Sequence, residues 1–171
     1  MDSTRLIFTD MKKITFAVLG FAAIMLTSCL KRNDNNNNGF YYDPFFVAER
    51  NGLVVYAYPG SAKIGTDSIS VFGVSQEAGV RMRFRFRDTG TYVLSGNQAK
   101  YYQLLGKDTV SRYNIGAANG SSVQVTAYDS VHKVIAGRFT LKFKRTFPAT
   151  SGVYADSVKF SNGKFVIALP R

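Results

Sequence analysis

A single histidine limits the nucleophilic chemistry open to this chain of 171 residues. Catalysis by serine, histidine and aspartate needs a base held against the nucleophile, and His132 is the one candidate base, with Asp129 and Ser130 beside it in the sequence. A catalytic triad is assembled in space from separate segments, whereas these three residues share one short polar stretch between two apolar ones. We therefore expect a solvated histidine at a hairpin tip and no catalytic residue here.

The other residue types that carry chemistry are too scattered to predict a site. A metal centre needs clustered histidine, cysteine or carboxylate ligands, and the chain has one His and one Cys. Glycine loops that cradle phosphate are absent. Any two carboxylates could meet in a glycosidase cleft, but neither Glu49 nor Glu77 has a suggestive context. The sequence thus predicts a protein without metal, cofactor or enzymatic activity.

Four arginines form the most conspicuous pattern in the chain. They are Arg81, Arg83, Arg85 and Arg87, and they alternate with Val80, Met82, Phe84 and Phe86. This spacing predicts a strand over residues 80–87 with one apolar and one basic face. Neighbouring charges about 7 Å apart repel by only about 0.6 kcal/mol in water, so a sheet tolerates the row without a ligand. A solvated face is the simpler interpretation, and contact with a polyanion is the alternative.

The N-terminal part of the chain predicts export and a lipid anchor. Residues 11–28 have two lysines, an apolar run and small residues at the end, which is the layout of a signal peptide. The only cysteine follows, and Leu26-Thr27-Ser28-Cys29 resembles the lipobox of bacterial lipoproteins. The resemblance implies cleavage before Cys29, a diacylglyceryl group on its thiol and an acyl chain such as palmitate on its new amino group.

These features divide the chain into four parts. Residues 1–10 are a mis-assigned start or an extension of the signal peptide, residues 11–28 the signal peptide, residues 29–39 the lipidated cysteine with an asparagine-rich tether predicted to be disordered, and residues 40–171 a domain.

We expect attachment to the outer membrane of the cell envelope. An exported protein does not meet the cell's nucleic acid, so the partners expected are the membrane and anionic glycans or lipopolysaccharide; the sequence names no protein partner.

Residues 40–171 alternate with a period of two almost throughout. Apolar runs at 45–49 and 53–58 flank Asn51-Gly52, a strong hairpin signal. Further strands are predicted at 67–75, 80–87, 121–129 and 137–147, and a hairpin over 156–169 with Asn162-Gly163 at its turn. Residues 96–106 fit either a short helix or a tyrosine-rich strand. Short strands separated by turns predict an all-β fold, a single antiparallel β-sandwich or barrel-like domain.

Several short motifs in this domain occur in an order that resembles one family. They are the hairpin at Asn51-Gly52, Gly90-Thr91-Tyr92-Val93-Leu94, the segment from Val123 to Phe139, and Ser161-Asn162-Gly163-Lys164-Phe165. Together they resemble small lipoproteins of Bacteroidota grouped as a domain of unknown function, over roughly residues 45–169. The resemblance implies an all-β domain on a lipid anchor and supplies no catalytic residues.

The function predicted is therefore that of a non-enzymatic, membrane-anchored envelope lipoprotein, acting as a structural or ligand-binding module. The alternative is an accessory module that binds glycans or lipopolysaccharide through the basic strand face or through exposed tyrosines. The tyrosine candidates are Tyr41, Tyr42, Tyr101 and Tyr102, whose other interpretation is packing in the core or at an edge.

Overall fold

The computed structural model describes residues 42–116 and 120–170. The predicted start region 1–10, the signal peptide 11–28, Cys29 with its tether to residue 39, and Tyr41 lie outside the described residues. They remain predictions from the sequence.

The described chain is built from antiparallel strands, which confirms the predicted all-β class. The strands are β1 Phe45–Arg50, β2 Leu53–Ile64, β3 Ser68–Val74, β4 Ala78–Phe84, β5 Gly90–Val93, β6 Ala99–Leu105, β7 Asp108–Ile115, β8 Ser122–Asp129, β9 Val134–Phe147 and β10 Ser157–Ala168. A single 3₁₀ turn, η1 at Gly96–Gln98, precedes β6.

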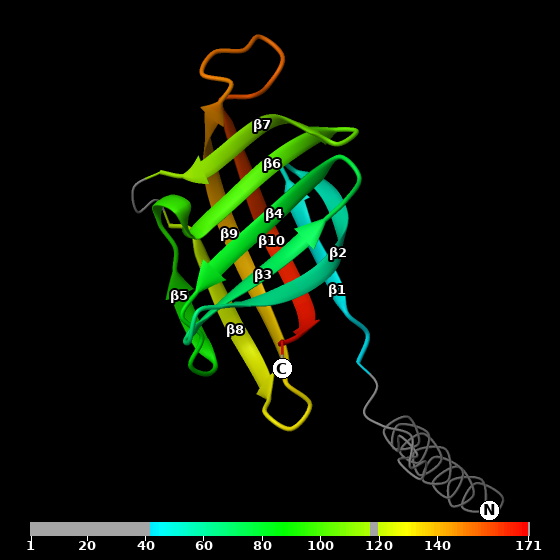
Figure 1. The fold of residues 1–171 in the computed structure, drawn as a ribbon, viewed down its shortest axis with the longest axis vertical. Coiled ribbons are helices and arrows are strands. Elements are labelled where there is room, and N and C mark those ends of the chain that lie inside the picture. The colour runs from blue at the N-terminus through cyan, green and yellow to red at the C-terminus, as the bar shows by residue number, and fades with distance from the viewer. Residues whose placement is uncertain (1–41, 117–119, 171) are drawn as a thin grey trace, which may run out of the picture. The chain divides into compact units, whose positions relative to one another are not determined.

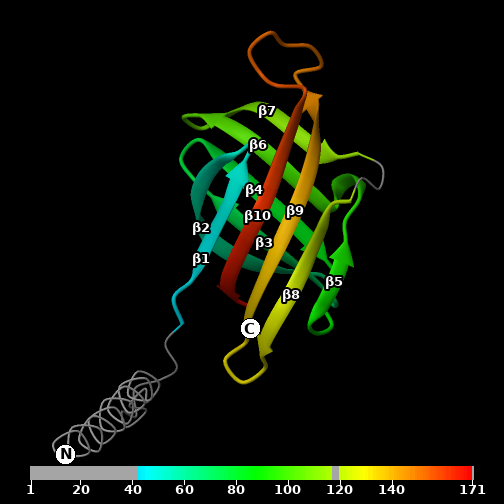
Figure 2. The same ribbon diagram turned by 180° about the vertical axis from the view of Figure 1, so that it is seen from behind.

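The strands pair in the order β10-β1-β2-β3-β4-β6-β7-β9-β8-β5, and β10 also pairs with β9. The extra pairing links eight strands into a ring, with β8 and β5 appended. Strand β9 makes this possible because it is long: β8 pairs with its segment 134–140, β7 with its segment 143–147, and β10 runs along the other edge. One layer contains β2, β3, β4, β6 and β7 (Figure 1), and the other contains β1, β10, β9, β8 and β5 (Figure 2).

The core lies between these layers and is rich in aromatic side chains. Tyr101 is near its centre, with ring centroids of Tyr113 and Phe160 each at 5.2 Å and that of Phe143 at 6.0 Å. Strand β9 contains the predicted strand 137–147, and its alternating residues Phe139, Leu141 and Phe143 are all buried. Alternation works here because successive strand residues point to opposite faces, and one face of each strand packs inward.

Several strand glycines are covered by aromatic rings. A Cβ atom added at Gly73 would lie 2.4 Å from the Phe46 ring, and one added at Gly163 would lie 2.6 Å from the Phe139 ring. The same arrangement pairs Gly60 with Phe72, Gly79 with Tyr102, and Gly137 with Phe165. The missing side chain of each of these glycines therefore gives the ring its place.

The two Asn-Gly pairs behave differently. Asn51 and Gly52 have φ values of 50° and 87° and form the predicted β1–β2 turn. Asn162-Gly163 was predicted to be a turn as well, and this is wrong: β10 continues through it as one strand, with Asn162 at φ 52°. Strand β10 pairs with β1 along one edge and with β9 along the other, and both pairings continue before and after Asn162. The unpaired residue at this position therefore forms a bulge.

Three smaller predictions need correction or completion. The basic strand ends at Phe84, so Arg85 and Arg87 follow β4. Strict alternation along the predicted strand 121–129 would place Ala127 on the inward face with Val123 and Val125, but a bulge after Val125 changes its face and exposes it. The ambiguous segment 96–106 is the tyrosine-rich strand β6 after η1, and strand β7 was not predicted.

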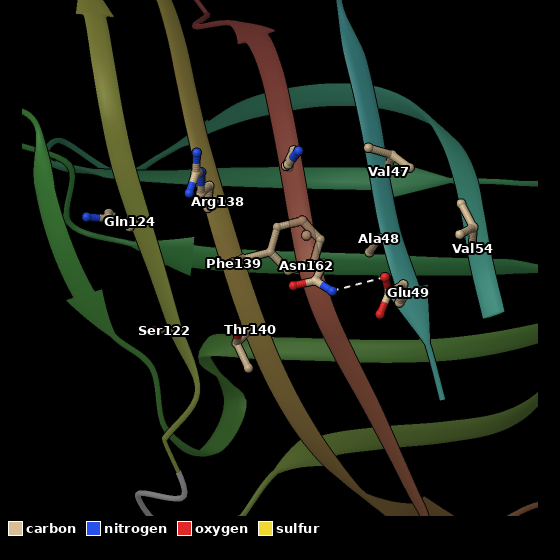
Figure 3. Close-up of a pocket in the computed structure, with 12 residues that line it drawn as sticks. Val47, Ala48, Glu49, Val54, Ser122, Gln124, Arg138, Phe139, Thr140 and Asn162 are labelled. Carbon is tan, nitrogen blue, oxygen red and sulfur yellow. Dashed lines mark hydrogen bonds between the residues drawn. The ribbon is translucent and has the colours of Figure 1, made fainter. Parts of the chain in front are cut away.

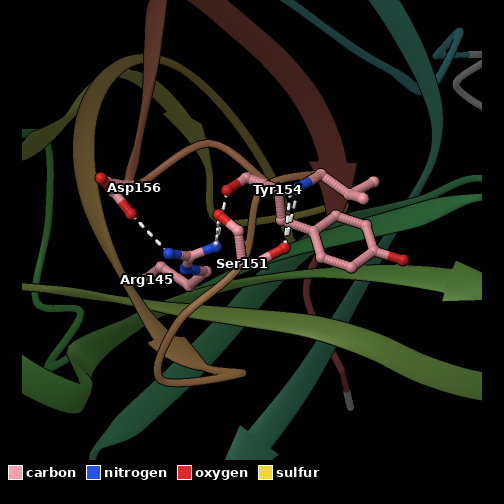
Figure 4. Close-up of polar contacts among 5 residues, drawn as sticks. Arg145, Ser151, Tyr154 and Asp156 are labelled. Atoms are coloured by element: carbon pink, nitrogen blue, oxygen red, sulfur yellow. Dashed lines mark hydrogen bonds and ion pairs between the residues drawn. The ribbon is translucent and has the colours of Figure 1, made fainter.

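A buried arginine holds the long loop between β9 and β10 (Figure 4). The Arg145 side chain is 5% exposed; it donates to the Tyr154 carbonyl at 2.6 Å and pairs with the Asp156 carboxylate at 2.5 Å. The Ser151 hydroxyl oxygen accepts from the backbone N–H groups of Val153 and Tyr154, each at 3.0 Å. Polar contacts therefore fix this loop where the two longest core strands leave the sheet.

Candidate functional site

The four predicted arginines all lie at the surface. Arg81, Arg83, Arg85 and Arg87 are exposed, whereas Val80, Met82 and Phe84 between them are buried. We call this set of outward side chains the arginine face; it belongs to the layer seen in Figure 1. The predicted assignment of the basic and apolar faces of the strand is confirmed.

One further cation lies beside the arginine face. Lys100 of β6 lies directly opposite Arg81, whose guanidinium carbon is 5.7 Å from the centroid of the Phe72 ring. Within the described residues only Arg85 of the four forms an ion pair, with Asp67 at 2.6 Å. A hollow of about 350 Å³ lies beside Arg83 and Arg85 and is lined also by Ser68, Asn97 and Gln98. This surface could receive an anionic group.

The three tyrosine candidates in the described part of the chain, Tyr42, Tyr101 and Tyr102, do not form an exposed platform. Tyr101 is 1% exposed, so the prediction that it belongs to an exposed platform is wrong. Tyr101 and Tyr102 are neighbours on β6, so their side chains point to opposite faces of the strand, and that of Tyr101 points into the core. Tyr102 is half-buried over Gly79, and Tyr42 is also half-buried. The exposed tyrosines are Tyr56 and Tyr58 on β2, at 78% and 81%. Their alternation along β2 was a signal in the sequence that a search for binding residues could have used.

His132 lies at the tip of the β8–β9 hairpin, as predicted. Its ring nitrogen Nδ1 is 2.7 Å from the Asp129 carboxylate, and the backbone N–H groups of His132 and Val131 donate to that carboxylate. The hydrogen bond from the His132 backbone is the largest of the effects that hold the pKa of Asp129 below its usual value. These contacts are those of a turn. Across residues 42–116 and 120–170, no three His, Cys, Asp or Glu residues cluster closely enough to hold a metal ion.

A second surface, which the sequence did not predict, is a groove of about 690 Å³ over the outward side of β1, β10, β9 and β8 (Figure 3). Its side chains are mostly polar or charged. They include Glu49, Gln124, Arg138, Thr140, Asn162 and Lys164. We call it the polar groove. It belongs to the layer seen in Figure 2, so the arginine face and the polar groove lie on different layers of the domain.

The fold thus defines an all-β domain of antiparallel strands with a basic face on one layer and a polar groove on the other. The chain belongs to the family described as domain of unknown function DUF6252, whose model matches residues 42–168. This confirms the resemblance to an uncharacterised domain family. No match was found among curated proteins or among solved structures. The described residues include no helix long and apolar enough to cross a membrane.

Proposed function

We propose that this chain is a non-enzymatic lipoprotein of the cell envelope, anchored to the outer membrane through acyl groups on Cys29, and that its domain binds anionic groups at that membrane. The observation that carries the proposal is the arginine face: four exposed guanidinium groups along one stretch of chain, with Lys100 beside them. The ligand chemistry that fits is a phosphate or carboxylate, as in lipopolysaccharide or an acidic polysaccharide.

The predicted anchor and the basic face support each other. A flexible tether of about ten residues has a root-mean-square reach of roughly 16–19 Å, which would keep the domain near the headgroups. Each basic residue near an anionic surface gains about 1 kcal/mol. Arginine also suits phosphate and carboxylate better than lysine because its planar guanidinium donates two parallel hydrogen bonds.

The double variant Arg83→Gln, Arg85→Gln tests the arginine face. With the full-length protein in detergent, we expect weaker binding to lipopolysaccharide micelles, and a salt dependence of the binding constant that flattens by about one log unit per lost phosphate contact, by analogy with duplex DNA. Both side chains are exposed and the Arg85–Asp67 pair is solvated, so the free energy of unfolding should change by less than about 1 kcal/mol.

Two outcomes would count against the proposal. Unchanged lipopolysaccharide binding and an unchanged salt slope would mean that the arginine face is merely solvated. Severe unfolding of the double variant would mean that these side chains are buried and paired, which contradicts the exposure of the arginine face. The control is Lys63→Gln on β2, an exposed cation outside this face.

A further inference from the structure

A bulge in β10, which appears in its pairing with β1 and in its pairing with β9, shapes the polar groove. The register of β1 with β10 shifts between Val47 and Glu49, and the register of β10 with β9 shifts between Phe160 and Gly163. Bulges bend a strand and re-aim its side chains, and they are frequent beside binding sites. Here the bulge places Glu49 of β1 next to Asn162 of β10, whose Nδ2 donates to Glu49 Oε1 at 3.0 Å (Figure 3).

The register aligns one row of outward side chains across five strands. Tyr56 of β2 lies opposite Val47 of β1, Val47 opposite Lys164 of β10, Lys164 opposite Arg138 of β9, and Arg138 opposite Gln124 of β8. Adjacent strands are about 4.8 Å apart, so Tyr56 lies roughly 10 Å from Lys164. The row therefore has an aromatic end, a cationic centre and an amide end.

Neither Arg138 nor Lys164 forms an ion pair within the described part of the chain. The ion pairs there are Arg85–Asp67, His132–Asp129 and Arg145–Asp156. Glu49 lies in the same groove, but its carboxylate accepts from Asn162 and, at 3.4 Å, from the Ser161 hydroxyl. Like charges directly opposite each other on paired strands are unfavourable. The exposed side chains of Arg138 and Lys164 thus form a site where a bound carboxylate would offset the repulsion between the two cations.

The rest of the groove suits a sugar ring. Gln124 and Asn162 offer amides, and Thr140 and Ser122 offer hydroxyl groups, which can donate to and accept from sugar hydroxyls. Beyond the groove lining, Tyr56 of β2 lies opposite the lining residue Val47 and is 78% exposed. Its ring face carries a negative charge that attracts the C–H groups of a sugar. A simple phosphate ion would use the two cations and leave the amides and the aromatic ring unused.

We propose that the polar groove binds a carboxylated saccharide, with the sugar carboxylate on Arg138 and Lys164, hydroxyl groups on Gln124 and Asn162, and a neighbouring sugar unit on Tyr56. The Glu49 carboxylate accepts a hydrogen bond from a sugar hydroxyl and repels a second acid group at its end of the groove. This repulsion favours one placement of the saccharide chain. This site goes beyond the proposed function, because it specifies a saccharide and because, apart from Tyr56 of β2, its residues lie on a different layer of the domain from the arginine face.

Titration calorimetry with the full-length protein in detergent tests this site. The probes are trigalacturonic acid, the neutral galactose trimer and inorganic phosphate. We expect trigalacturonic acid to bind, and the double variant Arg138→Gln, Lys164→Gln to weaken that binding by at least about tenfold. Tyr56→Ala, a change at an exposed residue, should weaken it by a similar factor. Lys63→Gln, an exposed cation outside both surfaces, is the matched control and should bind as the unchanged protein does. The Arg83→Gln, Arg85→Gln variant is measured alongside it to show whether the arginine face contributes.

Three results would overturn the proposal. The first is no binding of trigalacturonic acid at about millimolar concentration. The second is equal affinity for the neutral trimer or for phosphate, which would remove the role of the sugar carboxylate or of the sugar itself. The third is loss of binding in the arginine-face variant with none in the groove variants. The binding of lipopolysaccharide to the arginine face is measured separately, so a failure of this site can be told from a failure of the proposed function. The third result would leave the proposed function intact and would assign the saccharide to the arginine face.

Discussion

Replacing Gly137 with alanine is expected to lower the free energy of unfolding by about 3 kcal/mol, at the upper end of the cost of overpacking a core. The added Cβ atom would lie 2.5 Å from the backbone oxygen of Gln124 and 2.5 Å from Cζ of Phe165. The Gln124 oxygen belongs to β8, which is paired with β9 on both sides of this point. Because the backbone of a paired strand cannot move alone, the pairing of β8 with β9 must distort around this point.

Gly116→Ala is the control for this prediction. No heavy atom lies within 4 Å of a Cβ added at Gly116, so the free energy of unfolding should change by no more than about 0.5 kcal/mol. Urea unfolding of both variants, followed by circular dichroism, measures the difference. Equal midpoints for Gly137→Ala and the unchanged protein would mean that β8 and β9 do not approach as closely as described.

Replacing Tyr101 with alanine is expected to cost about 3–5 kcal/mol, as for other large-to-small changes of aromatic core residues. The Tyr101 ring is in contact with three other aromatic rings, and its removal would leave a cavity that they cannot fill without leaving their strands. Tyr101→Phe keeps the ring and loses the hydrogen bond that Arg50 donates to the hydroxyl oxygen at 2.9 Å, for about 1 kcal/mol.

The same residue makes a prediction for alkaline pH. Burial raises the pKa of Tyr101 above its usual value of 10.0, and Arg50 opposes this in part. The folded state thus favours the neutral phenol. Its contribution to stability is complete below about pH 10, where the unfolded phenol also keeps its proton, and is lost as the pH rises through the folded pKa. The free energy of unfolding should therefore fall less steeply above about pH 10 in Tyr101→Phe than in the unchanged protein. Parallel slopes would contradict this assignment.

Much of the fold could be predicted because alternation reports burial directly. Val80, Met82 and Phe84 are buried and the arginines are exposed, because successive strand residues point to opposite faces, as their alternation predicted. The dipeptide Asn-Gly was less reliable, since it forms a turn at Asn51 and a bulge at Asn162. The difference lies in the partners: β10 pairs with both β1 and β9, and a local pattern does not contain those distant pairings.

The polar groove could not be predicted for the same reason. Glu49, Arg138 and Lys164 belong to segments far apart in the sequence, and they meet through a register that includes the bulge in β10. Tyr101 and Tyr102 show a related limit. They are neighbours on one strand and point to opposite faces, and the predicted platform had assumed that both were available. The identity of the buried member follows from pairing with the core residue Tyr113, which the sequence does not reveal.

The intact mass of the protein extracted from membranes tests the proposed lipoprotein most directly. The account predicts a chain that begins at Cys29 and carries acyl groups on that residue, and a Cys29→Ser variant that is released from the membrane fraction or retained as an uncleaved, unacylated precursor. A wild-type protein that is soluble, unacylated and still bears residues 11–28 would contradict it.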